Sequence, residues 1–431
     1  MKGRREATLL ALLLACLTCL PGGLSGCRRS GTGVPPLLSG EPITVGVPLP
    51  LTGSKAAFGE AKRNAYEMAM EEINASGGVD GRPLVLLVRD TAGDPVASAA
   101  VAEELITVEQ VTLLAGEYSS ACALAVAGVA QRHGIPYLVD SAVADAVTQQ
   151  KWSFVFRLSP PSELLVQGLT DFLESVVKPR SVAVIYEHSE FGASVARSMR
   201  SWCQDKGVPL VAYEGYQAGA LDFTAVITRV KQASPDVVFL VSYLLDASLL
   251  ARQAWAQGLR PKLMAGGAGG FALPEFVANA GEAAENMVVA APWAPTLPYP
   301  GAAEFAETYR ARYGTLPPYL AAEAHACVYV LQDALRRAAS TDPERLRKAL
   351  AATDLLTVFG PVRFEAWGKF RNQNRPASAV LQVLQGQPEV VWPLEWATAP
   401  YVSPDPANAS GSRRTFASRS TPVSRCISAT R

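Results

Sequence analysis

The sequence predicts an α/β protein built as two doubly wound, flavodoxin-like lobes. Three observations predict this class: apolar strand-like runs alternate with helix-like segments, the alternation occurs in two successive sets, and 431 residues are too many for one hydrophobic core. Runs such as "LVLLVRD" and "VVFLVS" are almost continuously apolar, which is typical of parallel strands covered by helices on both faces. Apolar residues make up 49% of the chain, which is enough for two cores.

The N-terminus has the pattern of a secretion signal. Three basic residues within the first five precede an apolar stretch over residues 7–20, which is shorter than the roughly 20 residues that a transmembrane helix needs. The tetrad "LSGC" that ends at Cys27 resembles the lipobox of bacterial lipoproteins, in which the cysteine receives a diacylglycerol and becomes the mature N-terminus. This resemblance implies a signal peptide over residues 1–26 and an extracytoplasmic lipoprotein, anchored to a membrane in the periplasm or on the outer face of the cell. The alternative is an ordinary secretory peptide with a chance cysteine.

The first set of elements follows a spacer. Residues 27–42 are rich in glycine, serine and proline, and we expect a flexible linker there. Apolar spacing then predicts strands over 43–51, 84–90, 111–116, 135–140 and 153–159, and helices over 61–75, 96–110 and 121–133.

The second set repeats the pattern. It predicts helices over 162–177, 192–206, 222–233 and 246–257, and strands over 181–187, 208–213, 237–242 and 262–266. After Ala290 an irregular stretch precedes three more helices and two strands, over 301–313, 318–338, 343–351, 360–365 and 379–385. Residues 397–431 have few core-forming side chains, and we expect a disordered, basic tail.

Several function classes are excluded by composition and motif. Lys plus Arg number 39 and Asp plus Glu number 39, so nothing indicates nucleic acid. The three histidines lack metal-ligand spacing, and Cys122, Cys203 and Cys327 lie in apolar helical patterns typical of small buried residues. The sequence contains no nucleophile elbow, phosphate loop or dinucleotide fingerprint. We therefore expect no enzyme, no metal and no cofactor.

A family resemblance extends over residues 43–396. The chain resembles leucine/isoleucine/valine-type periplasmic binding proteins, which implies a type I fold of two lobes joined by three crossing strands. It also implies closure on a small ligand and delivery to the permease and ATPase subunits of an ABC importer. The implied lobes are 43–159 plus 291–375, and 160–290 plus 376–396. The resemblance is carried by "VPLPLTGSKAAFGEAKRNAYEMAMEEINASGGVDGRPLVLLVRDTAGDP", "LLAGEYSSACALAVAGVAQRHGIPYLVDSA", "YEHSEFGASVARSM", "DFTAVITRVKQASPDVVFL", "ARQAWAQGL" and "FGPVRFEAWGKF".

The loops after two predicted strands suit a ligand with a carboxylate. "GEYSS" and "DSAVAD" follow strands of the first set, and ligands of doubly wound sheets bind beyond the carboxyl ends of the strands. The hydroxyls of Ser120 and Ser141 can add hydrogen bonds to those from backbone amides. The alternative is that Ser119, Ser120 and Ser141 are helix caps.

The family pattern implies contacts from both lobes. The first lobe would offer Phe58, Ser120, Ser141, Ala142 and Val143, and the second lobe would offer Phe191, Tyr243 and Gly267. Aromatic side chains on both sides can clamp a ligand when the cleft shuts. The alternative is that Phe58 and Phe191 are ordinary packing beside glycine turns and that Tyr243 is a core residue at the end of a strand.

Two departures from the family pattern bear on the ligand. Val143 stands where amino-acid binders place a threonine hydroxyl, and "MAGGAGGF" supplies glycines where leucine-type proteins place an acid. A buried ammonium without a counter-charge is costly. Glu117 and Asp246 are the nearest substitutes, although both can be solvated loop charges; otherwise the ligand is an amide, a urea, an aromatic acid or a similar molecule. A second hypothesis is a ligand sensor of the same fold that signals through a separate membrane protein.

Overall fold

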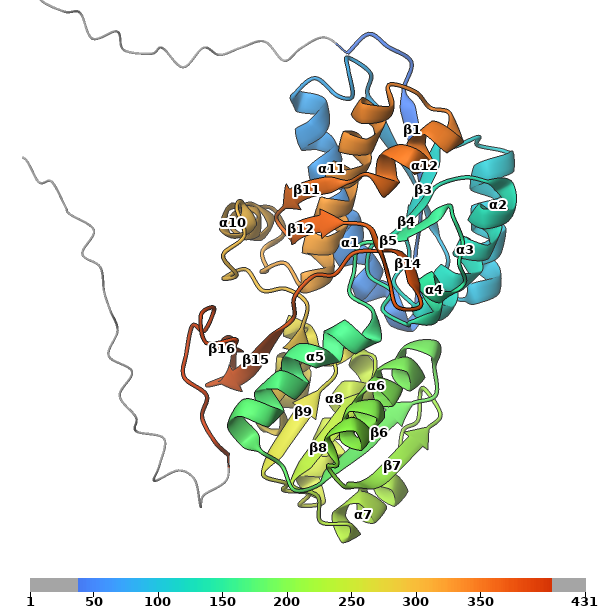
Figure 1. The fold of residues 1–431 in the computed structure, drawn as a ribbon. Helices are drawn as coiled ribbons and strands as arrows, with labels where there is room; N and C mark the ends of the chain where they lie inside the picture. Colours follow the sequence, from blue (N-terminus) through green and yellow to red (C-terminus); the bar gives the residue numbers. More distant parts are fainter. Residues whose placement is uncertain (1–37, 405–431) are drawn as a thin grey trace, which may run out of the picture. The chain divides into compact units, whose positions relative to one another are not determined.

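The structure, a computed structural model, describes residues 38–404. These residues belong to one compact unit and contain two seven-stranded sheets (Figure 1). In order across the first sheet the strands are β13 (Glu365–Trp367), β14 (Phe370–Gln373), β5 (Val155–Arg157), β4 (Tyr137–Val139), β3 (Leu113–Gly116), β1 (Ile43–Leu49) and β2 (Leu84–Asp90). In order across the second sheet they are β16 (Gln387–Trp392), β15 (Ala379–Leu384), β10 (Val288–Ala291), β9 (Leu263–Gly266), β8 (Val237–Val241), β6 (Val182–Glu187) and β7 (Leu210–Tyr216).

Five strands of each sheet run parallel in the same order. β1 lies between β2 and β3, with β4 and β5 beyond β3, and β6 lies likewise between β7 and β8, with β9 and β10 beyond β8. This 2-1-3-4-5 order is that of flavodoxin-like sheets. At the other edge β14 adds parallel to β5, whereas β15 adds antiparallel to β10. The prediction of two doubly wound sheets is confirmed.

Helices connect the strands throughout. A separate hairpin pairs β11 (Asp354–Thr357) with β12 (Gly360–Arg363). The α-helices are α1 (Ala56–Ala75), α2 (Pro95–Thr107), α3 (Ser120–His133), α4 (Ala146–Gln149), α5 (Ser162–Phe172), α6 (Glu190–Lys206), α7 (Thr224–Gln232), α8 (Leu244–Ala256), α9 (Pro274–Ala280), α10 (Ala302–Tyr313), α11 (Tyr319–Ala338) and α12 (Pro343–Ala351). The short helical segments are η1 (Gly53–Lys55), η2 (Leu173–Val177), η3 (Gly269–Ala272) and η4 (Gly281–Ala284).

Local sequence signals set several helix ends. The side chain of Asp94 accepts from the backbone N–H of Ala97 at the start of α2, and a proline occupies the first helical position. Ser189 caps α6 in the same way by accepting from the N–H of Gly192. α3 ends at Gly134, which has a φ of 65°, a left-handed conformation that glycine adopts without steric cost.

Alternate residues of the central strands pack on opposite faces of each sheet. Leu113 and Ala115 of β3 belong to the core that includes α1 and α11, whereas Leu114 between them packs with α2 and α3. In β6, Val184 and Ile185 are likewise divided between two clusters. This period of two follows from strand geometry. Both sheets are therefore covered on two faces, as the apolar runs predict.

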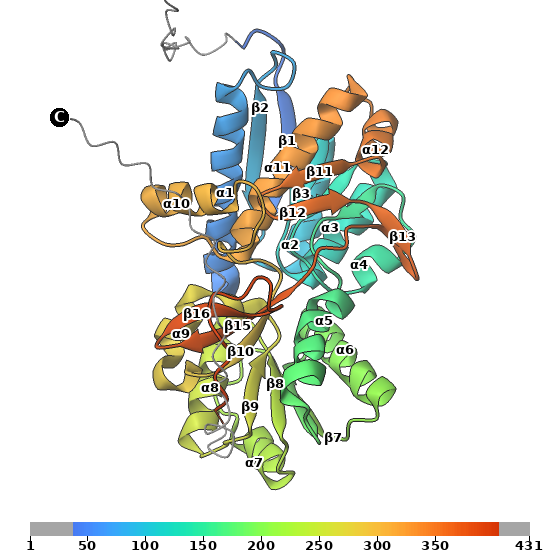
Figure 2. The ribbon, with the colours of Figure 1, turned by 60° about the vertical axis from the view of Figure 1, so that its left-hand side comes forward.

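The chain passes between the two sheets three times. It leaves the first sheet after β5 to form α5, returns after β10 to form α10 and α11, and leaves again after β14 to form β15 (Figure 2). Three crossings agree with the expected connection of two lobes. The exact lobe boundaries stay a prediction.

Some sequence expectations need correction. The run at 84–90 was expected to be buried on both faces, but β2 is an edge strand and only Leu84 in it is buried. Patterning also misses α9 and the strands β10, β11, β14 and β16, because each is only four to seven residues long and carries too few residues for a clear period.

Within the flexible linker expected over 27–42, residues 39–41 are hydrogen-bonded to the turn before β2. The N–H of Ser39 donates to the carbonyl of Gly81 at 3.1 Å. Arg82 Nε donates to the carbonyl of Glu41 at 2.7 Å. The turn before β2 therefore fixes this segment. The signal peptide and Cys27 lie outside the described residues.

Part of the segment expected to be disordered over 397–431 is held by hydrogen bonds. The N–H of Thr398 donates to the carbonyl of Val390 at 2.8 Å. The N–H of Val402 donates to Gln382 Oε1, and the carbonyl of Val402 accepts from Gln382 Nε2. These bonds fasten residues 397–402 to the edge of the second sheet, so disorder is the wrong expectation there. Residues 405–431 lie outside the described part. None of the helices within residues 38–404 is long and apolar enough to span a membrane.

Candidate ligand-binding site

The predicted ligand-contacting residues gather beyond the carboxyl ends of strands in both sheets. Phe58 lies in α1 after β1, Ser120 opens α3 after β3, and Ser141 follows β4. From the second sheet, Phe191 lies in α6 after β6, and Tyr243 precedes α8 after β8. β1 with β3, and β6 with β8, are the strand pairs at which each sheet reverses its order of connection. Ligands of doubly wound sheets bind at such points.

A small cavity lies among these residues. Its volume of about 10 Å³ holds about one water molecule. Five of the predicted residues line it, namely Ser120, Ser141, Val143, Phe191 and Tyr243. The other lining residues, which sequence reasoning missed, are Tyr118, Leu165, Ala268, Gly269, Pro292 and Tyr319.

Aromatic side chains from both halves fill the space around the cavity. Phe58 stacks on Tyr118 with ring centroids 4.1 Å apart. Tyr243 lies 5.7 Å from Tyr118 and 5.1 Å from Phe191, measured between ring centroids. The hydroxyls of Tyr118 and Tyr319 are hydrogen-bonded at 3.1 Å. The aromatic residues are therefore in direct contact across the two halves, as the family pattern implies for a clamp.

A buried arginine fixes the loop after β4. Arg157 Nη1 donates to the carbonyls of Ala142 at 3.3 Å and of Ala144 at 2.6 Å. The hydroxyl of Ser162 donates to the carbonyl of Val143 at 3.0 Å. Three successive carbonyls of the loop are thus held by side chains. The loop that carries Ser141, Ala142 and Val143 is consequently rigid at its backbone.

The serine side chains do not act as ordinary helix caps. Ser119 occupies the cap position of α3, but its hydroxyl makes no capping hydrogen bond. Ser120 Oγ accepts from the N–H of Ala144 at 3.2 Å, and Ser141 Oγ accepts from Lys62 Nζ at 3.2 Å. The hydroxyls of Ser120 and Ser141 instead join the loop after β3 to the loop after β4 and to α1.

Five of the predicted residues do not line the cavity, namely Phe58, Ala142, Gly267, Glu117 and Asp246. Gly267 packs inside the second half, where a Cβ on it would lie 2.7 Å from the ring of Phe239; its successors Ala268 and Gly269 line the cavity instead. Glu117 turns back to α2.

The two acids proposed as charge partners are engaged elsewhere. Glu117 Oε1 accepts from Ser98 Oγ at 2.9 Å and its Oε2 accepts from the N–H of Tyr118 at 3.0 Å. Asp246 Oδ2 accepts from the N–H of Gly219 at 2.8 Å. Burial raises the pKa of both carboxyls. Neither lines the cavity.

A buried ion pair underlies the loop after β4. Lys62 Nζ lies 2.6 Å from Asp140 Oδ1, and both side chains are fully buried. Lys62 also donates to the carbonyl of Glu117 and to Ser141 Oγ. The hydroxyl of Tyr66 donates to Asp140 Oδ2 at 2.7 Å. The pair therefore ties α1 to the loops that carry the site.

Glu323 lies close to this pair without joining it. Its side chain is fully buried in α11, and neither carboxyl oxygen has a hydrogen-bond partner among the described residues. Burial raises the pKa of the Glu323 carboxyl well above its usual range, and the charge of Asp140 adds to this effect. No sequence motif points to Glu323, because it stands in the second turn of an alanine-rich helix.

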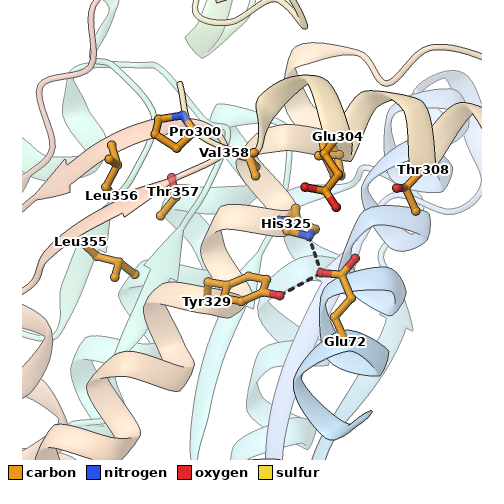
Figure 3. A pocket seen from close by; sticks show the side chains of 12 residues that line it. Glu72, Pro300, Glu304, Thr308, His325, Tyr329, Leu355, Leu356, Thr357 and Val358 are labelled. Carbon is orange, nitrogen blue, oxygen red and sulfur yellow. Dashed lines mark hydrogen bonds and ion pairs between the residues drawn. The ribbon is translucent and has the colours of Figure 1, made fainter. Parts of the chain in front are cut away.

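A larger pocket of about 370 Å³ lies elsewhere (Figure 3). His325 Nε2 and the hydroxyl of Tyr329 each lie 2.9 Å from Glu72 Oε2 in its wall. Glu72 and Phe58 are 14 residues apart on α1, or roughly 21 Å along the helix axis. None of the predicted ligand-contacting residues lines this pocket.

The described residues contain no cluster of metal-ligating side chains. Within residues 38–404 no group of three or more His, Cys, Asp or Glu side chains could hold a metal ion. Cys122, Cys203 and Cys327 are free thiols buried on α3, α6 and α11, which confirms their interpretation as small buried residues.

The chain is similar to known proteins over most of its length. Residues 42–387 match a family model described as periplasmic binding protein. The chain is 30% identical over 371 residues to Leu/Ile/Val-binding protein homolog 7 of Brucella melitensis biotype 1, which covers 81% of this chain and 91% of the relative.

Two solved structures share the fold. The branched-chain amino acid transporter substrate binding protein LivJ of Streptococcus pneumoniae, in complex with isoleucine, has a TM-score of 0.73 at 25% identity, covering 81% of this chain and 99% of the other. A solute binding protein of an ABC transporter from Rhodopseudomonas palustris BisB5, in complex with 3,4-dihydroxy benzoic acid, has a TM-score of 0.71 at 19% identity, covering 80% and 95%. The family match covers far more than half of the chain. The chain therefore belongs to the periplasmic binding protein family of solute-binding proteins.

Proposed function

We propose that the protein is a lipid-anchored, extracytoplasmic solute-binding protein of an ABC importer. It captures an amino acid or a related small organic molecule between its two lobes and presents it to permease and ATPase subunits. The observation that carries this proposal is the cavity at the carboxyl ends of both sheets, where Tyr243 meets Phe58 and Tyr118. Lipid attachment at Cys27 is supported by the lipobox-like tetrad alone.

The first half favours a carboxylate. Ser120 opens α3, so the unpaired backbone N–H groups of the first helical turn lie next to its hydroxyl. Such a helix start attracts negative charge. Ser141 adds a second hydroxyl to the same wall. Val143 contributes no hydroxyl, so backbone N–H groups carry more of the binding than they do in the amino-acid binders that the sequence resembles.

Capture requires a change in conformation. The cavity of about 10 Å³ is far too small for an amino acid, because ligand pockets measure about 300–1,000 Å³. The lobes must therefore separate, or the aromatic side chains must turn aside, before a solute binds. Bending at the three crossings between the sheets accomplishes this, and contacts from both lobes then stabilise the closed form around the ligand.

The candidate ligand classes come from the relatives and from the site. The relatives named for Leu/Ile/Val and the neighbour that holds isoleucine favour an α-amino acid. The fold also accommodates 3,4-dihydroxy benzoic acid in the Rhodopseudomonas palustris protein. Amino acids and aromatic acids are therefore the first probes, with amides and ureas after them.

A thermal-shift screen over these four classes tests the proposal. A solute that binds the folded protein raises Tm with the logarithm of its excess over Kd. The double variant Ser120→Ala, Tyr243→Ala should lose the stabilisation by any hit while remaining folded. The matched control, Ser234→Ala with Tyr329→Ala, changes the same residue types away from the cavity and should keep it. Equal stabilisation of both double variants would show that the solute binds at a different site.

A further inference from the structure

Glu323 lies next to the cavity wall without lining the cavity itself. It lies one helical turn after Tyr319 in α11, and Tyr319 lines the cavity. Helical side chains lean toward the N-terminus of their helix, so Glu323 leans toward the turn of Tyr319. The hydroxyl of Ser141, which also lines the cavity, lies beside the Glu323 carboxyl and favours its charged form. Glu323 therefore stands directly behind two residues of the cavity wall.

The surroundings of Glu323 lack a free positive charge. Lys62 is the nearby cation, and its ammonium group already donates to Asp140, to the carbonyl of Glu117 and to Ser141. An ammonium group has three donors, so all of them are used. A buried carboxylate is stable only when a cation or several donors accompany it. Within the described part of the chain Glu323 is the only acid with buried carboxyl oxygens that have no partner.

We propose that Glu323 supplies the negative charge that recognises an ammonium group on the bound solute, and that it gives up its proton as that solute enters. The proton passes from the carboxyl to solvent, and the resulting carboxylate faces the ligand ammonium, while the N-terminal N–H groups of α3 face the ligand carboxylate. This inference rests on the proposed function and narrows it. The preferred solute carries an ammonium group beside its carboxylate, and a plain carboxylic acid binds less well.

The other titratable groups around Glu323 do not compete for this role. Tyr118 and Tyr319 face it from the loop after β3 and from α11, and burial raises the pKa of both phenols, so they stay neutral at physiological pH. The charges that remain are those of Lys62 and Asp140, which form an ion pair with each other. Tyr66 and Cys327 lie against Asp140, and burial raises the pKa of both groups.

Isothermal titration calorimetry on the full chain tests the inference with matched probes. The pairs are L-leucine with 4-methylpentanoate and L-phenylalanine with 3-phenylpropanoate, which differ only in the amino group. Titrations in two buffers of different ionisation enthalpy give the number of protons released. For the pair that binds, we expect the amino acid to bind at least about tenfold more tightly and to release about one proton near pH 7. Its affinity should rise with pH, by up to about tenfold per unit.

Variants separate a recognition role from a structural one. Glu323→Gln keeps the shape of the side chain, and it should abolish both proton release and the preference for the amino acid while changing affinity for the deaminated acid by no more than about twofold. Asp246→Asn removes a buried acid that does not line the cavity and should change neither quantity.

The outcomes distinguish a failure of the inference about Glu323 from a failure of the proposed function. The inference is overturned, and the proposed function stands, if a deaminated acid binds as tightly as its amino acid or if binding by the unmodified chain releases no proton. It is also overturned if Glu323→Gln retains both effects. If no member of the screened classes binds at all, the proposed function fails and the inference falls with it. The measurement on the unmodified chain decides the question even if Glu323→Gln does not fold.

Discussion

Tyr243, which precedes α8, lies edge-on against Phe58 of α1, with ring centroids 5.9 Å apart and an angle of 71° between the ring planes. The two residues follow strands of different sheets, so their contact joins the two halves of the protein. A solute that binds between the halves must displace or reorient this contact. In the proposed function, the pair therefore links ligand binding to the relative position of the lobes.

Removing the Tyr243 ring should weaken binding. In Tyr243→Ala the solute loses an aromatic surface from the second lobe, and we expect Kd to rise roughly tenfold to hundredfold, or about 1.4–2.7 kcal/mol. Tyr243→Phe retains the ring and should bind within about threefold of the unmodified chain. Titration calorimetry with the best solute from the screen measures both. Wild-type affinity in Tyr243→Ala would show that the cavity is not where the solute binds.

Breaking the buried ion pair should destabilise the first half. Lys62→Met leaves Asp140 buried without its cation, and we expect the free energy of unfolding to fall by about 3–5 kcal/mol. Combining Lys62→Met with Asp140→Asn should recover a large part of the loss, because the uncompensated charge is gone. Urea unfolding followed by circular dichroism measures these changes.

An exposed ion pair provides the control for Lys62→Met. Arg310 Nη2 lies 2.6 Å from Glu307 Oε2 on the surface of α10, and such exposed pairs contribute at most about 1 kcal/mol. Arg310→Met should therefore hardly shift the urea midpoint. A small effect of Lys62→Met, comparable with that of Arg310→Met, would mean that water reaches Asp140.

The ligand-free protein should lose stability as pH rises because of Glu323. Its pKa is raised in the folded state above the ordinary value of 4.5, so the folded chain keeps a proton that the unfolded chain releases. Stability therefore falls by up to about 1.4 kcal/mol per pH unit between the two pKa values. Glu323→Gln removes this slope, so the variant should become increasingly more stable than the unmodified chain above about pH 5 and equal to it below about pH 4. Parallel melting curves for the two proteins at every pH would contradict the assignment.

Replacing Cys27 should release the protein from the membrane. Cys27→Ser removes the thiol that would carry the diacylglycerol, and a protein without acyl chains lacks the apolar surface that holds it to lipid. We expect the variant in the soluble fraction of the native host, and the unmodified protein in the membrane fraction with a lipid mass on its first residue. An unmodified Cys27 with residues 1–26 still attached would rule out the anchor.

The sequence predicts the fold well where elements are regular. Parallel strands such as β6 and β8 are almost continuously apolar, so their positions agree with prediction within about two residues. The edge elements are harder. β14 and β16 owe their pairing to neighbours far along the chain, and the hydrogen bonds of Gln382 to Val402 have no local signal.

The site is predictable to the extent that it follows strand ends. Ser120, Ser141 and Tyr243 all stand just beyond strands, so topology alone brings them together. Glu117 also stands there, yet its φ of 56° turns the chain and its side chain bonds to Ser98. The residue types alone do not predict that the Glu117 side chain points away from the cavity.

Glu323 illustrates what the sequence leaves out. It lies behind the cavity wall only because α11 packs against α1 in the same core. That packing places a helix from the C-terminal third of the chain beside loops from its first third. A local sequence pattern contains no information about such a long-range contact.

A crystal structure with the solute that gives the largest thermal shift is the decisive measurement. We expect the ligand to lie among Ser120, Ser141, Val143 and Tyr243, enclosed by residues of both sheets. A ligand bound instead in the pocket of Glu72 and His325, or on one half alone with the other half clear of it, would contradict capture between the lobes.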